Sequence, residues 1–120
     1  MRIVRDEDLR EFVDENGDKL ITLTKVRKRD YDRRQQLIIE MANVDMTDPT
    51  KPKIADFKID QSKINEFMFQ TVAKKMIIGG QEITDEALLE TYRNLDKESG
   101  EWVDRCVTEI WGETETAKKN

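Results

Sequence analysis

The apolar residues near the C-terminus constrain the fold of this chain more than any other feature of its sequence. They recur at helical spacing, which predicts an amphipathic helix over about residues 99–111. A large apolar side chain contributes roughly 1.5–3 kcal/mol when it is buried, so this helix must pack against another element. The single cysteine lies inside the stripe, which favours a packed thiol over a reactive one. The stripe consists of Trp102, Val103, Cys106, Val107, Ile110 and Trp111.

A second apolar pattern predicts a central helix over about residues 61–78. Its apolar residues cover so much of the circumference that we expect neighbours on several sides. Gly79 and Gly80 follow directly, and no phosphate-loop pattern surrounds them. We therefore interpret this pair as the end of the helix. The apolar positions are Ile64, Phe67, Met68, Phe69, Val72, Ala73, Met76 and Ile77.

Two further helices are indicated by N-cap residues. Asp30 precedes a helix over about residues 31–44. Thr84 is the N-cap of a helix over about residues 84–95, which has acidic residues in its first turn. Both segments carry an apolar stripe and a polar face. With the two helices above, they predict a bundle of about four helices.

The N-terminal part of the chain has the pattern of a β-hairpin over about residues 9–26. Asn16 and Gly17 suit a type I′ turn, and β-branched residues follow them. A short helix over residues 8–13 is the alternative, because apolar residues also fall at helical spacing there. Residues 54–59 could add a strand to the hairpin.

Length and composition favour one domain. At 120 residues the chain has enough sequence for one modest core, which we assign to residues 1–112, with residues 113–120 as a disordered polar tail. We expect an α+β fold that is mostly helical, with the hairpin or a small sheet before the bundle. One cysteine, no leader-like start and no long apolar run predict a cytoplasmic protein that is not inserted in a membrane.

Nothing in the sequence indicates catalysis. Histidine is absent, which removes the commonest general base near neutral pH and a common zinc ligand. No paired acids, nucleophile motif or metal-ligand spacing stands out. We therefore predict no catalytic residues, no metal, no cofactor and no enzymatic activity.

One short segment, residues 25–34, is basic in a chain of net charge −5. One interpretation is nucleic-acid binding, with Tyr31 stacking on a base. The preferred interpretation is a solvated strand exit and helix start, because a single aromatic residue is no stacking platform and the overall charge repels phosphate. Nucleic acid is therefore an improbable partner. The cations of this basic segment are Lys25, Arg27, Lys28, Arg29, Arg33 and Arg34.

Two stretches resemble a known family. The sequence LITLTKVRKRD, followed by a long apolar helix, and the closing pattern IIGG-x-x-ITDEALLETYRNLDKESGEWVDRCVTEIW resemble the small tail assembly chaperones of long-tailed, siphovirus-like bacteriophages. The resemblance lies mainly in the C-terminal third. It implies a non-enzymatic assembly factor in the host cytoplasm that binds a helical tail protein, either the tape measure protein or a tail tube subunit.

Four side chains are candidates for contacting such a partner, because methionine adapts its shape and aromatic residues supply large contact areas. The alternative for each is that it belongs to the core. Self-association stays open, as does a different role, that of an acidic inhibitor that mimics nucleic acid and blocks a host enzyme. The four candidates are Met76, Tyr92, Trp102 and Trp111.

Overall fold

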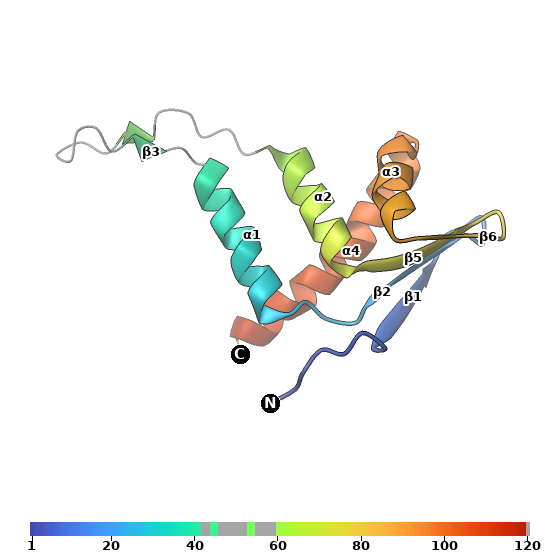
Figure 1. Cartoon of the computed structure of the whole chain (residues 1–120), viewed down its shortest axis with the longest axis horizontal. Helices are drawn as coiled ribbons and strands as arrows, with labels where there is room; N and C mark the ends of the chain where they lie inside the picture. Colours follow the sequence, from blue (N-terminus) through green and yellow to red (C-terminus); the bar gives the residue numbers. More distant parts are fainter. Residues whose placement is uncertain (42–43, 46–52, 55–59, 120) are drawn as a thin grey trace.

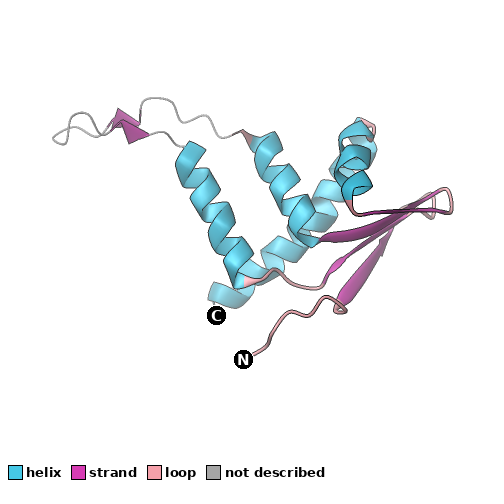
Figure 2. Cartoon of the chain, viewed as in Figure 1, coloured by secondary structure: helices cyan, strands magenta, loops and turns pink. Residues whose placement is uncertain are grey.

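Two β-hairpins from separate parts of the chain form one antiparallel sheet, and helices cover one of its faces (Figures 1 and 2). The computed structural model describes residues 1–41, 44–45, 53–54 and 60–119. The elements in chain order are β1 (Leu9–Val13), β2 (Lys19–Leu23), α1 (Lys28–Met41), β3 (Val44–Asp45), β4 (Lys53–Ile54), α2 (Gln61–Val72), β5 (Ala73–Ile78), β6 (Gln81–Thr84), α3 (Glu86–Asn94) and α4 (Lys97–Lys119).

The expected α+β class is confirmed, but the helices do not form the expected bundle. The sheet has the strand order β1-β2-β5-β6, and α3 packs against β5 and β6 as well as against α2. α1 and α2 run side by side, and α4 crosses behind them (Figure 1). The difference arises because residues 73–78, which were predicted as the end of a helix, form a strand that extends the sheet under α3.

The N-terminal hairpin is confirmed, so the alternative helix over residues 8–13 is wrong. Its turn differs from the predicted type I′. The Gly17 N–H donates to the Asp14 carbonyl over 3.1 Å, the Asp14 N–H donates to the Asp18 carbonyl over 2.9 Å, and Gly17 has a φ of +84°. Asn16 keeps a negative φ. This pattern is a three-residue loop that ends on a left-handed glycine.

The predicted helix over 61–78 is wrong beyond Val72. Its last residues form β5, which turns at Gly79 and Gly80 into β6. The φ angles of these glycines are +58° and +81°, as the two central positions of a type I′ hairpin turn require. The glycine pair therefore reverses a strand rather than ending a helix.

The start of α3 also differs from the prediction. Thr84 is the last residue of β6 and not an N-cap. Asp85 takes the cap position with a φ of +55°, and its side chain makes no capping hydrogen bond. The close succession of strand and helix leaves one residue for the change of direction.

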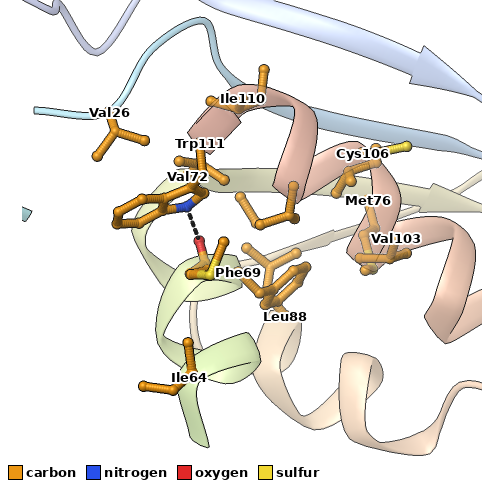
Figure 3. Close-up of a cluster of buried hydrophobic side chains, with 14 residues drawn as sticks. Val26, Ile64, Phe69, Val72, Met76, Leu88, Val103, Cys106, Ile110 and Trp111 are labelled. Carbon is orange, nitrogen blue, oxygen red and sulfur yellow. Dashed lines mark hydrogen bonds between the residues drawn. The ribbon is translucent and has the colours of Figure 1, made fainter. Parts of the chain in front are cut away.

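The main core lies between the sheet and α2, α3 and α4 (Figure 3). Across the sheet, Leu20 of β2 lies opposite Met76 of β5, and both side chains are buried. From α4, Trp111 is 1% exposed, and its Nε1–H donates to the Met68 carbonyl of α2 over 3.2 Å (Figure 3). The predicted apolar stripe of this helix is confirmed. Its buried residues are Val103, Cys106, Val107, Ile110 and Trp111, whereas Trp102 is half-buried.

α4 is longer than the predicted 99–111 at both ends. Asp96 caps it, since its carboxylate accepts the Ser99 N–H over 2.8 Å and its carbonyl accepts the Gly100 N–H over 2.9 Å. The helix continues to Lys119, so the disordered tail predicted for residues 113–120 is wrong as far as residue 119. The sequence there contains no proline to stop the helix. Residue 120 lies outside the described part of the chain.

The middle of the chain departs from the prediction in smaller ways. α1 begins at Lys28, before the predicted start at residue 31, so Asp30 lies in its first turn and is not the N-cap. Of the predicted last residues, 42–43 lie outside the described part and Val44 belongs to β3. Ile54 belongs to β4, which pairs with β3 rather than with the N-terminal hairpin, and residues 55–59 are not described. None of the helices in the described ranges is both long and apolar enough to cross a membrane.

Substitution at the glycine turn tests the second hairpin. We expect Gly79→Ala and Gly80→Ala each to destabilise the protein by roughly 1–2 kcal/mol, because left-handed backbone is unfavourable for a residue with a Cβ. The space beside both glycines is open, so no clash adds to the effect. Gly100→Ala is the matched control. It adds a methyl to open space within a helix and should stabilise by about 0.5–1 kcal/mol in urea unfolding. Equal effects at the three positions would contradict the turn.

The cap of α4 predicts a pH dependence. The Ser99 backbone N–H lowers the pKa of Asp96, so the stabilisation is present above the unfolded-state pKa, about 3.9, and is lost as the pH falls through the lower folded-state pKa. Asp96→Ala should lower Tm at pH 7, and its difference from the wild type should shrink below about pH 4. Asp96→Asn keeps a capping oxygen and should stay close to the wild type at pH 7. A constant Tm difference for the alanine variant across this range would refute the role of the charge.

Candidate functional site

A hollow lies between the loop of the first hairpin and the first turns of α4. Its inner part, which we call the Trp102 pocket, has a volume of about 100 Å³. Its outer part, which we call the acidic groove, has a volume of about 520 Å³. Asp14, Ser99 and Trp102 line both, so the pocket and the groove lie side by side. The apolar lining of the pocket is Leu20, Met76, Ile78, Leu95, Trp102 and Val103.

Carboxylates surround this hollow. Six of them line the pocket and the groove, against two cations, Lys19 and Arg105. The Lys19 ammonium lies 3.0 Å from a carboxylate oxygen of Glu11, which offsets part of its charge. The surface is therefore strongly negative around an apolar floor. The six acids are Asp14, Glu15, Asp18, Asp96, Glu98 and Glu101.

Three of these acids hold the walls in place. The Asp14 carboxylate accepts the backbone N–H groups of Asn16 and Asp18, each over 2.9 Å. The Asp18 carboxylate accepts the N–H of Gly79 over 3.0 Å, which fastens the first hairpin loop to the second. Asp96 caps α4, as described above. Because their oxygens bind backbone groups, these walls are preformed.

The other three acids, Glu15, Glu98 and Glu101, are exposed. Glu15 lies on the hairpin loop, and the other two lie on the first turns of α4, so they face the groove from two elements. The Lys97 ammonium lies 3.9 Å from Glu101. An exposed pair of this kind contributes little energy, so Glu101 can exchange it for another cation.

The four predicted partner-contacting residues separate in the structure. Trp102 and Met76 meet at the pocket, where Met76 is 2% exposed and belongs to the core floor. Trp111 is wholly inside the core, which corrects its assignment as a contact residue. Tyr92 lies elsewhere, between α2, α3 and α4. Only Trp102 among the four combines partial exposure with a place in the hollow.

Tyr92 is held by its own neighbours. Its ring stacks on Phe69 with centroids 4.5 Å apart, and its hydroxyl donates to Asp104 over 2.6 Å. Burial and this hydrogen bond both raise the pKa of Tyr92, so the phenol stays protonated. Burial likewise raises the pKa of the Cys106 thiol to about 11, which makes it unreactive near neutral pH. Both groups are structural.

The basic segment does not form one cationic surface. Arg34 is 7% exposed and lies between two rings, with its guanidinium carbon 5.2 Å from the Tyr31 centroid and 4.5 Å from the Trp111 ring. Its assignment to a basic patch is therefore wrong: the planar guanidinium packs in the interior by stacking on aromatic faces.

Most other cations of the segment lie beside acids. Arg27 contacts Asp6 at 2.8 Å, Lys28 contacts Asp32 at 2.6 Å, Arg29 lies 4.0 Å from Asp30, and Arg33 lies 3.5 Å from Glu40. Lys25 is exposed. The neighbouring carboxylates offset the positive charge that phosphate binding would use.

Sequence reasoning missed the acidic groove. Its signal was present in the run Asp14-Glu-Asn-Gly-Asp18 around the first turn and in the run Asp96 to Glu101 before Trp102. Each run has a local explanation, the first as the turn of a hairpin and the second as the polar start of a helix, so neither indicates a groove by itself. Their juxtaposition requires the sheet to place the hairpin loop beside α4.

The geometry can therefore accommodate an apolar side chain with cations around it. Among the described residues, no group of three or more carboxylates and thiols is arranged to hold a metal ion. Comparison of the chain with known protein families, curated proteins and solved structures found no match.

Arginine substitutions test the assignment of Arg34. We expect Arg34→Ala to destabilise the protein by about 1–3 kcal/mol in urea unfolding, because it removes stacking on Tyr31 and Trp111 and leaves a cavity. Arg33→Ala, one residue away and exposed, should change stability by about 0.5 kcal/mol or less. Equal stability of the two variants, with weaker nucleic-acid binding by Arg34→Ala alone, would restore the basic patch.

Proposed function

We propose that this protein is a non-enzymatic adaptor that binds a helical tail protein before assembly, like the phage tail assembly chaperones it resembles. The observation that carries the proposal is the Trp102 pocket, an apolar hollow with a half-buried tryptophan at its mouth. Its client would be the tape measure protein or a tail tube subunit. Such an adaptor would work in the host cytoplasm, where tails assemble.

The pocket has properties that suit protein recognition. Tryptophan at a partly exposed site supplies large contact area, and such residues often dominate the energy of an interface. Met76 at the floor is unbranched and can adapt to the shape of an entering side chain. The fixed walls reduce the ordering cost of binding.

The alternative functions have less support. For a nucleic-acid regulator, the basic segment would have to offer one cationic surface, yet Arg34 is buried and Arg27 binds the Asp6 carboxylate and the Val4 carbonyl. For an acidic mimic of nucleic acid, the carboxylates would have to project as a regular array. Here they surround an apolar pocket. An apolar centre with a polar rim is typical of a surface that binds an apolar side chain of a protein, not of one that imitates a row of phosphates.

Co-expression with a tail protein tests the proposal. We expect a helical tail protein encoded beside this chain to co-purify with it and to gain solubility, because the adaptor covers apolar client surface. Trp102→Ala should reduce complex recovery by about tenfold or more, as for a central interface residue. Ile39→Ala is the control, since Ile39 is an exposed apolar residue on α1, outside the residues that line the hollow.

Two results would reject the adaptor role. One is that neither the tape measure protein nor the tube subunit forms a complex with this protein. The other is equal loss of complex with Trp102→Ala and Ile39→Ala when both variants keep the wild-type circular dichroism spectrum.

A further inference from the structure

The charge around the Trp102 pocket indicates the chemistry of the partner segment. We infer that the acidic groove binds a basic stretch of a protein partner, in which one aliphatic residue enters the Trp102 pocket and flanking lysines or arginines meet the carboxylates. This inference rests on the proposed adaptor function and names the kind of sequence that the adaptor recognises.

The pocket selects an aliphatic anchor. Its volume is about 100 Å³, and most of its lining residues are apolar. Leu20, Met76 and Val103 supply apolar contacts at the floor, and all three are buried residues of the core. A polar side chain would lose its water there and find mainly apolar neighbours. An aliphatic side chain gains free energy by the same burial.

The groove selects cations on both sides of that anchor. Glu15 projects from the hairpin loop, whereas Glu98 and Glu101 project from α4 on the opposite wall. A chain that passes between these walls meets negative charge from each. Asp14 and Asp96 add fixed negative charge, because their carboxylates are bound by backbone N–H groups.

Trp102 joins the two parts of the site. It lines both the pocket and the groove, so one part of its ring can contact the aliphatic anchor. The exposed part can accept a neighbouring lysine or arginine over its face. Nucleic acid is disfavoured in this hollow by the same carboxylates that attract a basic peptide.

Peptide binding tests the inference. We would measure fluorescence anisotropy with three labelled peptides: GKRLKRG, the same sequence with serine in place of leucine, and GEELEEG. We expect the leucine-containing basic peptide to bind roughly tenfold or more tightly than either of the others. Its affinity should fall as the ionic strength rises, since exposed charge pairs are screened by salt.

Charge-neutralised variants locate the binding. The triple variant Glu15→Gln, Glu98→Gln, Glu101→Gln should bind GKRLKRG about tenfold more weakly than the wild type. The control triple variant Glu7→Gln, Glu86→Gln, Glu90→Gln changes the net charge equally at exposed positions outside the hollow and should bind like the wild type. Trp102→Ala should bind about tenfold more weakly or worse, with its fold checked by thermal unfolding.

The outcomes separate this inference from the adaptor proposal. Equal binding of the three peptides, or equal weakening by both triple variants, would overturn the basic-segment inference. A tail protein that co-purifies through Trp102 while GKRLKRG does not bind would overturn it and leave the adaptor function in place. Selective binding of GKRLKRG without any tail-protein complex would support the inference and reject the tail client.

Discussion

The pairing of β2 with β5 is the interaction on which the rest of the structure depends. It joins residues that are more than fifty positions apart in sequence, with Leu20 opposite Met76. This pairing makes one sheet of two hairpins and gives α2, α3 and α4 a common apolar face to cover. The bond from the Gly79 N–H to the Asp18 carboxylate then ties the two turns together beside α4.

The candidate site follows from that arrangement. An isolated hairpin loop would expose Asp14 and Asp18 to water, and an isolated helix would expose Trp102. Brought together, they enclose an apolar pocket whose floor is core and whose rim is charged. Backbone bonds hold the aspartates and packing holds the tryptophan, so the walls of the site are formed without a bound partner. Exposed glutamates then supply charge that is free to meet a ligand.

The charge distribution separates two uses of charged side chains in this protein. In the basic segment, Arg34 is an interior residue that stacks on Tyr31 and Trp111, and Arg27 is held by Asp6. Those cations stabilise the attachment of α1 and of the N-terminal residues. Around the hollow, by contrast, carboxylates outnumber cations. In this chain of net charge −5, the charged surface that a partner could recognise is therefore the acidic groove.

The sequence by itself determined the α+β class, the N-terminal hairpin and the buried stripe of α4, because these depend on local periodicity and turn residues. Gly79-Gly80 carried a turn signal too, but the apolar run before it fits a helix and a strand equally well by periodicity. Only β2, which supplies backbone partners for residues 73–78, decided for a strand. The position of Trp102 in a hollow and of Trp111 in the core was also decided by tertiary structure. Both residues belong to one apolar stripe of α4. The stripe alone does not show that its Trp111 end packs against α2, or that its Trp102 end lies beside the loop of the first hairpin.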